Sequence, residues 1–215
     1  PYPAGGLCYR NKCMRNLVAF LAPEVYHSDD LDATVGIFGI EGSKPGASSA
    51  AVYLSHRIIR PDQSGYGQIL GKSLFNSKRF FASVVTMAEP DDPFIVVPVQ
   101  QIPAEKEGKR EEEIETQLKY IKENIAKKEN AELVNDPKAM ALLKELGSDQ
   151  IIITYAFNFK KKDGKLNTDP DLANKFNKKI FDKLSLSPDP SITKDTPLII
   201  TTSEFDPEIY GWDFV

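Results

Sequence analysis

The feature that most constrains this chain is a short turn of glycine and small residues that runs directly into a helix. The turn reads Glu41-Gly42-Ser43-Lys44-Pro45-Gly46-Ala47 and continues into an alanine-rich segment. Its two glycines can adopt backbone angles that other residues avoid. Ser43 is a natural helix N-cap, and Pro45 suits the first helical turn. The stretch therefore predicts a tight turn followed by a helix.

The start of this helix has more than one interpretation. Backbone amides, a hydroxyl and the positive end of a helix dipole together favour a bound phosphate or carboxylate. Most helix starts bind no anion, so these residues by themselves favour an ordinary capped junction. A serine hydrolase with Ser43 as nucleophile is disfavoured, because Pro45 follows too closely for the sharp strand-to-helix turn that such a nucleophile needs.

Prolines divide the rest of the chain, most firmly at Glu89-Pro90-Asp91-Asp92-Pro93. Apolar periodicity and turn residues predict helices and strands on either side of this break. The expected elements are a strand at 7–10, helices over 47–59 and 64–87, a strand over 94–99, an amphipathic helix within 104–130, a helix over 137–146, a strand over 151–159, a helix from 169 and a strand over 197–202.

This order of elements indicates an α/β chain whose C-terminal half is α+β, with a small antiparallel or mixed sheet covered by helices. We expect two domains. Residues 1–90 would contain the glycine-serine turn and the long helices, and residues 91–215 would form a small α+β domain.

Composition excludes several classes of function. The net charge of −4 argues against nucleic acid as a partner, and no apolar run approaches the length of a membrane span. Cys8 and Cys13 are too few for a disulfide framework. His27 and His56 are far apart and lack neighbouring ligands, so we expect no metal site. A cytoplasmic protein fits these properties.

Several spaced motifs in the first 87 residues carry a resemblance to a known family. They are Pro1-Tyr2-Pro3-Ala4-Gly5-Gly6, Met14-Arg15, the turn at 41–47, and Gly65-Tyr66-Gly67. With these motifs the chain resembles the group II pyridoxal-phosphate (PLP) decarboxylases of amino acids, and within them the microbial L-tyrosine decarboxylase branch. The Gly-Ser-Lys-Pro-Gly element is also similar to an element of sphingosine-phosphate lyases.

The resemblance implies a fold-type I enzyme that works as a dimer, with PLP as cofactor. Gly42 and Ser43 would then contact the cofactor phosphate bound in the other subunit. Tyr2 matches a tyrosine that serves as proton donor to the substrate α-carbon, although it could equally be a packed aromatic between two prolines. Tyr26 and His27 would lie in a loop over the active site.

The resembling enzymes carry their PLP-binding lysine a few residues before the position of Tyr2, and this chain starts at Pro1. We therefore expect the C-terminal part of a decarboxylase, without the covalent lysine and inactive in isolation. The implied substrate is a small L-amino acid, such as tyrosine, and the implied partner is a second copy or the N-terminal portion. The alternative is a stand-alone, non-catalytic binding or structural module derived from such an enzyme.

Overall fold

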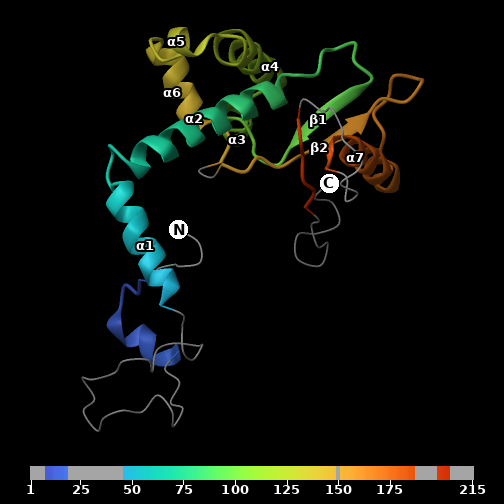
Figure 1. Ribbon diagram of the computed structural model, residues 1–215. Helices are drawn as coiled ribbons and strands as arrows, with labels where there is room; N and C mark the ends of the chain where they lie inside the picture. The colour runs from blue at the N-terminus through green and yellow to red at the C-terminus, as the bar shows by residue number, and fades with distance from the viewer. Residues whose placement is uncertain (1–7, 19–45, 149–150, 187–197, 204–215) are drawn as a thin grey trace. The chain divides into compact units, whose positions relative to one another are not determined.

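The computed structural model describes residues 8–18, 46–148, 151–186 and 198–203 (Figure 1). Two compact units divide the chain, residues 1–70 and residues 71–215. The division falls within a long helix, whereas the sequence places a domain boundary between residues 90 and 91. That boundary stays a prediction about the domains of the protein.

The first unit is helical where it is described. A short 3-10 helix, η1 (Lys12–Val18), begins where the Asn11 side chain accepts a hydrogen bond from the Cys13 N–H (2.9 Å). The strand expected at 7–10 is wrong for residues 8–10, which are exposed and have no strand beside them among the described residues. Helix α1 (Ala47–Ile58) confirms the helix expected after the glycine-serine turn.

Helix α2 (Tyr66–Val85) confirms the second expected helix and leads to a two-stranded antiparallel sheet. Its strands are β1 (Phe94–Pro98) and β2 (Tyr155–Phe159), with Val96 opposite Phe157. Helix α7 (Pro170–Leu184) packs against β2, and Phe176 contacts Phe159 edge to face, with 5.5 Å between ring centroids (Figure 1). Aromatic side chains thus join this helix to the sheet.

Several helices fill the segment between the strands, and the amphipathic helix expected within 104–130 is confirmed over residues 111–126, whose Ile121 and Ile125 are buried in the core. The helices are α3 (Pro103–Lys106), α4 (Glu111–Ile121), the π-helix η3 (Lys122–Ala126), α5 (Asn130–Leu133) and α6 (Pro137–Glu145). Gly108 adopts a φ of +64° between α3 and α4, which ends the first of them. Asp136 caps α6 as expected, because its carboxylate accepts from the N–H groups of Lys138 (3.1 Å) and Ala139 (3.0 Å).

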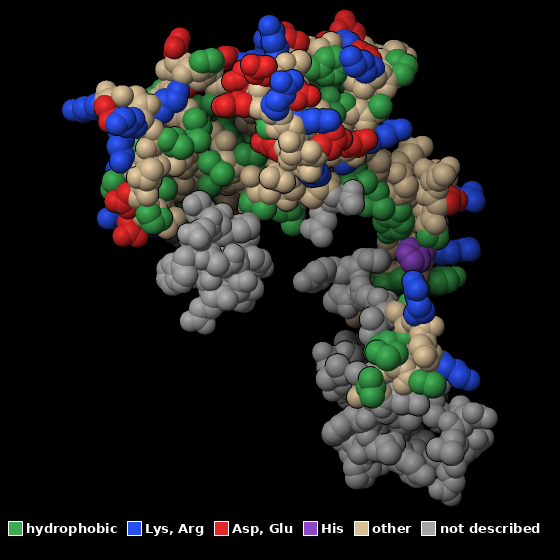
Figure 2. Space-filling view, turned by 180° about the vertical axis from the view of Figure 1, so that it is seen from behind, with side chains coloured by type: hydrophobic (Ala, Val, Ile, Leu, Met, Phe, Trp, Pro, Cys, Tyr) green, Lys and Arg blue, Asp and Glu red, His purple; other side chains and the backbone are tan. Residues whose placement is uncertain are grey.

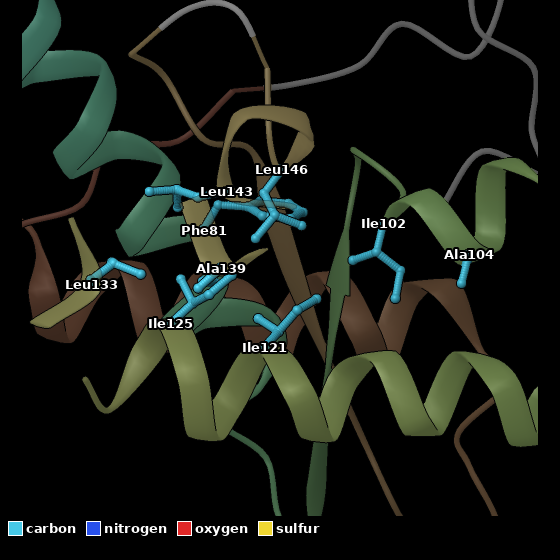
Figure 3. Packing of buried hydrophobic residues seen from close by; sticks show 10 residues of the cluster. Phe81, Ile102, Ala104, Ile121, Ile125, Leu133, Ala139, Leu143 and Leu146 are labelled. Atoms are coloured by element: carbon cyan, nitrogen blue, oxygen red, sulfur yellow. The ribbon is translucent and has the colours of Figure 1, made fainter. Parts of the chain in front are cut away.

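The hydrophobic core of the second unit lies where α2 meets these short helices (Figure 3). Its members share almost complete burial and come from elements far apart in the sequence. They are Phe81, Ala82, Ile102, Ala104, Ile121, Ile125, Leu133, Ala139, Leu143 and Leu146.

Two expected strands differ from the structure. Only Tyr155–Phe159 of the segment 151–159 is a strand, because Ile153 packs against the core instead. Residues 198–203 form no strand, and the side chain of Asn177 occupies the middle of the β2 edge where a third strand would add. The fold is therefore mixed helix with a small antiparallel sheet, which confirms that part of the expectation; the fold-type I assignment stays a prediction.

Candidate functional site

The residues that the sequence places at the site lie outside the described part of the chain. They are the proton-donor candidate Tyr2, the loop candidates Tyr26 and His27, and the phosphate contacts Gly42 and Ser43. The structure neither brings these side chains together nor separates them, so their roles stay predictions. What it does describe is the helix that follows the turn.

Helix α1 begins with free hydrogen-bond donors. The Gly46 carbonyl accepts the Ala50 N–H (3.1 Å), which leaves the preceding amides of the first turn without a partner among the described residues. No described side chain caps this end, and its first turn carries no acidic residue. A Cβ added to Gly46 would meet nothing within 4 Å. Unpaired amides beside open space are the donor set that a phosphate group needs, so this helix start fits the phosphate of PLP.

The apolar side chains of α1 are unusually exposed. None of its residues is buried, and Tyr53, Leu54 and Ile58 are 64%, 58% and 81% exposed. Exposed apolar groups of this size on neighbouring turns are typical of a surface that another element or chain covers. The described residues contain no such cover for α1.

The junction between α1 and α2 explains the Gly65-Tyr66-Gly67 motif. A Cβ on Gly65 would lie only 2.1 Å from the Arg60 carbonyl oxygen, and one on Gly67 would lie 3.0 Å from the carbonyl oxygen of Asp62. The same carbonyls accept the N–H groups of Tyr66 and Gly67, both at 2.9 Å. Both glycines are therefore requirements of a tight turn between two helices.

The Asp62 side chain also stabilises this junction. Its carboxylate accepts the backbone N–H of Ser64 (2.8 Å) and the Ser64 hydroxyl (2.6 Å), and it pairs with Arg60 (2.9 Å). The hydrogen bonds from Ser64 lower the pKa of Asp62 below its usual value. The ionised carboxylate thus stabilises the turn that precedes α2.

Three polar side chains meet where α1 and α2 approach each other. The hydroxyls of Ser55 and Tyr66 share a hydrogen bond, and the His56 ring lies edge to face with Tyr66, with 5.9 Å between the ring centroids. Within the described residues no hydrogen bond joins His56 to Ser55, so the trio lacks the base-to-nucleophile contact of covalent catalysis. His56 is exposed, as expected for a structural or surface residue.

A polar cleft of about 400 Å³ lies in the second unit, and sequence reasoning missed it. The Lys78 ammonium in its wall donates to the carbonyls of Lys144 (2.9 Å) and Leu146 (2.7 Å), which neutralises the C-terminal end of α6. A lysine used in this way is a helix cap. No sequence signal links the residues that line the cleft, because they come from distant segments. They are Lys78, Pro103, Lys106, Glu107, Lys144, Glu145, Gly147 and Ser148.

Three further properties of the described residues concern metal binding, membrane crossing and surface charge. Among the described residues, no group of His, Cys, Asp and Glu side chains is placed to bind a metal ion. No described helix has the length and apolar character that crossing a bilayer requires. Lys, Arg, Asp and Glu side chains are interspersed over the face of the second unit that Figure 2 shows.

Comparison with known proteins identifies relatives for one segment of the chain. It is 41% identical over 81 residues to an L-tyrosine decarboxylase of Enterococcus faecium. It is 34% and 33% identical over 82 residues to the L-tyrosine decarboxylases of Enterococcus faecalis and Levilactobacillus brevis. Each match covers 37% or 38% of this chain but only 13% of the relative. No protein-family model matches the chain.

These matches confirm the resemblance to the tyrosine decarboxylase branch of the PLP-dependent decarboxylases. They concern a segment and leave most of the relatives' length without a counterpart here. The chain therefore contains a decarboxylase-related segment.

Proposed function

From this likeness to L-tyrosine decarboxylases, we propose that the chain is part of a PLP-dependent L-amino-acid decarboxylase that acts on an aromatic amino acid such as tyrosine. The observation that carries the proposal is the identity of 33–41% to L-tyrosine decarboxylases from three organisms. A soluble enzyme in the cytoplasm, with the fold-type I architecture, is part of the same proposal. So is the division at residue 90 into the end of a large domain and a small C-terminal domain.

PLP would supply the chemistry of decarboxylation, because its ring accepts the electrons released when carbon dioxide leaves the substrate. The part of this chain is to hold the cofactor's phosphate. Gly42, Ser43 and the first amides of α1 would donate hydrogen bonds to it, supported by the positive end of the helix dipole. The start of α1, which no described side chain caps, supports this role.

Tyr2 would complete the reaction by moving a proton. A phenol can donate its hydroxyl proton to the substrate α-carbon once the carboxylate has gone, provided that it lies within hydrogen-bond reach. Tyr26 and His27 would contact the substrate from a loop and limit the access of water. These roles come from the resemblance.

The exposed apolar face of α1 supports a partner for this site. In a homodimer it would be covered by a second copy, which would bring the turn at Gly42 and Ser43 next to the cofactor of the other subunit. The N-terminal portion of the same decarboxylase could also cover it. Either partner would remove the exposed Tyr53, Leu54 and Ile58 from water.

The proposal is tested with the natural polypeptide that carries this chain, assayed for the release of tyramine and carbon dioxide from L-tyrosine with PLP present. We expect turnover that Tyr2→Phe reduces by at least about a hundredfold in kcat, since a positioned proton donor contributes about that much. Ser43→Ala should weaken PLP binding, whereas Ser83→Ala, which removes an exposed hydroxyl on α2, should not. A polypeptide that binds PLP but leaves L-tyrosine unchanged would refute the substrate, and one that binds no PLP would refute the enzyme.

A stand-alone, non-catalytic module is the second candidate. The core of residues 71–215 favours it, because its buried residues all come from that unit and need no other chain. Borohydride reduction of the isolated chain with PLP, followed by peptide mapping, tests whether this chain holds the cofactor covalently, which neither candidate expects. We expect no pyridoxyl-lysine; a labelled lysine would show that the chain holds the cofactor covalently by itself.

A further inference from the structure

The two outer edges of the small sheet differ in how their backbone groups are satisfied. In an antiparallel pair, alternate residues direct their N–H and C=O groups toward the partner strand or away from it. The Lys160 N–H donates to the Pro93 carbonyl (2.8 Å), and the Val99 N–H donates to the Thr154 carbonyl (3.1 Å). These two hydrogen bonds show which residues of β1 face β2. In the observed register, the backbone groups of Phe94, Val96 and Pro98 point away from β2.

The outer edge of β2 is closed by side chains. Phe157 donates its N–H to Asn177 Oδ1 (2.8 Å), and Asn177 Nδ2 donates to the Phe157 carbonyl (2.7 Å), so this amide replaces a neighbouring strand. At Phe159 the N–H donates to Asn158 Oδ1 (2.9 Å), and the carbonyl accepts the N–H of Asn167 (2.9 Å). No further strand can pair along this edge without displacing these groups.

The outer edge of β1 is open. The outward N–H and C=O groups of Phe94 and Val96 have no partner within the described residues, and β1 lies at the edge of its sheet. Pro98 also faces away from β2. It has no N–H, and a proline is tolerated at such an outer position because no hydrogen bond to the partner strand is lost. A charged side chain, a common protection of such an edge, is absent from β1, and Pro98 at the end of the strand is its one residue of a protective type.

We propose that the open edge of β1 pairs with β1 of a second copy of this chain, antiparallel and centred on Val96. In this register the two Val96 residues exchange both backbone hydrogen bonds, and each Phe94 N–H donates to the Pro98 carbonyl of the other copy. About this twofold axis the Val96 groups and each Phe94 N–H are paired, whereas each Phe94 carbonyl faces a Pro98 that has no N–H to donate.

The closed edge of β2 decides what such pairing produces. A sheet with two open edges can grow without limit, but here each copy offers only β1. The product is a discrete dimer with the strand order β2-β1-β1-β2. Its aromatic faces become continuous, since Phe94 and Val96 lie on the same side of the sheet as Phe157.

The pairing is tested by crosslinking the full chain with its own cysteines removed (Cys8→Ser and Cys13→Ser). In the proposed register, the two Val96 Cα atoms lie about 5.5 Å apart. This distance is within the range that a disulfide spans. Val96→Cys should therefore give a covalent dimer after mild oxidation with oxidised glutathione. Val99→Cys is the matched control, because its two copies would be about 20 Å apart. Absence of the Val96→Cys dimer, or equal crosslinking of both variants, would overturn the proposal.

Proline variants give an independent measurement by light scattering. Val96→Pro removes the outward N–H, so it should raise the dissociation constant of the dimer about tenfold or more and leave the thermal unfolding of the monomer nearly unchanged. Val97→Pro instead removes an N–H directed at Ala156 and should lower the unfolding temperature. The proposal fails if the wild-type mass stays at 24.0 kDa at every concentration, or if Val96→Pro dimerises as the wild type does.

This inference does not rest on the proposed function. A dimer held only through α1 would leave Val96→Cys uncrosslinked, and a chain without decarboxylase activity could still pair through β1. A crosslink to a different protein would give a product whose mass differs from twice that of this chain. Such a product would contradict the proposal that the partner is a second copy.

Discussion

Helices α1 and α6 use apolar side chains in opposite ways. Helix α6 has nine residues and buries Ala139 and Leu143 completely or almost so, against α2 and the π-helix η3 (Figure 3). Helix α1 is longer, with twelve residues, and buries none. Both sequences have an apolar stripe. The difference teaches that periodicity shows that a helix has a face to bury but does not show what will cover it.

The largest expected effect is the difference in stability between matched leucine substitutions on these two helices. Leu143→Ala removes a side chain from the core and should lower the free energy of unfolding by about 2–5 kcal/mol. Leu54→Ala makes the same change on α1, where the side chain is 58% exposed, and should change it by no more than about 0.5 kcal/mol. Urea unfolding of the isolated chain measures both. Similar losses for the two variants would mean that α1 is covered within this chain.

A smaller effect compares two glycines near the start of α2. Gly65→Ala places a Cβ against the Arg60 carbonyl and should cost about 1–3 kcal/mol, as overpacking does. Gly71→Ala adds a Cβ that meets nothing within 4 Å inside the helix, and should stabilise it by about 0.5–1 kcal/mol. Hydrogen exchange of the Tyr66 and Gly67 amides would report the difference. Equal protection in both variants would show that the turn tolerates a side chain.

The smallest effect is a pH dependence confined to the second unit. The hydrogen bond from Lys128 (2.7 Å) and those from the first amides of α6 lower the pKa of Asp136 below its usual value of 3.8. A lowered pKa gives stability that is present above the unfolded value and lost as the pH falls through the folded value. Unfolding measured below about pH 4 should therefore show a loss that Asp136→Asn removes. An unchanged acid profile in this variant would assign the loss to other carboxylates.

The sequence predicted well those elements whose signals are local. Asp136 and Asp169, each followed by proline, begin α6 and α7 as helix caps. The alanine-rich segment after Gly46 forms α1, and Phe94–Pro98 forms a strand. In each case a cap, a proline or β-branched residues determine the structure within a few positions.

What the sequence could not predict depends on distant residues. Residues 198–202 of the expected third strand form no strand, and on the β2 side an asparagine of α7 occupies the sheet edge, which no local pattern shows. Ile153 has the β-branched character of a strand residue but packs on the core. For the site, motifs pointed to the decarboxylases, and the matches confirm that likeness.

Two adjacent residues of α2 have a further consequence. Lys78 donates to carbonyls at the end of α6, and Arg79 donates to those of Ala126 (3.1 Å) and Lys128 (2.5 Å) at the end of η3. One turn of a single helix thus serves as a common anchor for two others. A shift of α2 along its axis would break the hydrogen bonds to both helix ends together, so the ends of α6 and η3 are coupled through α2.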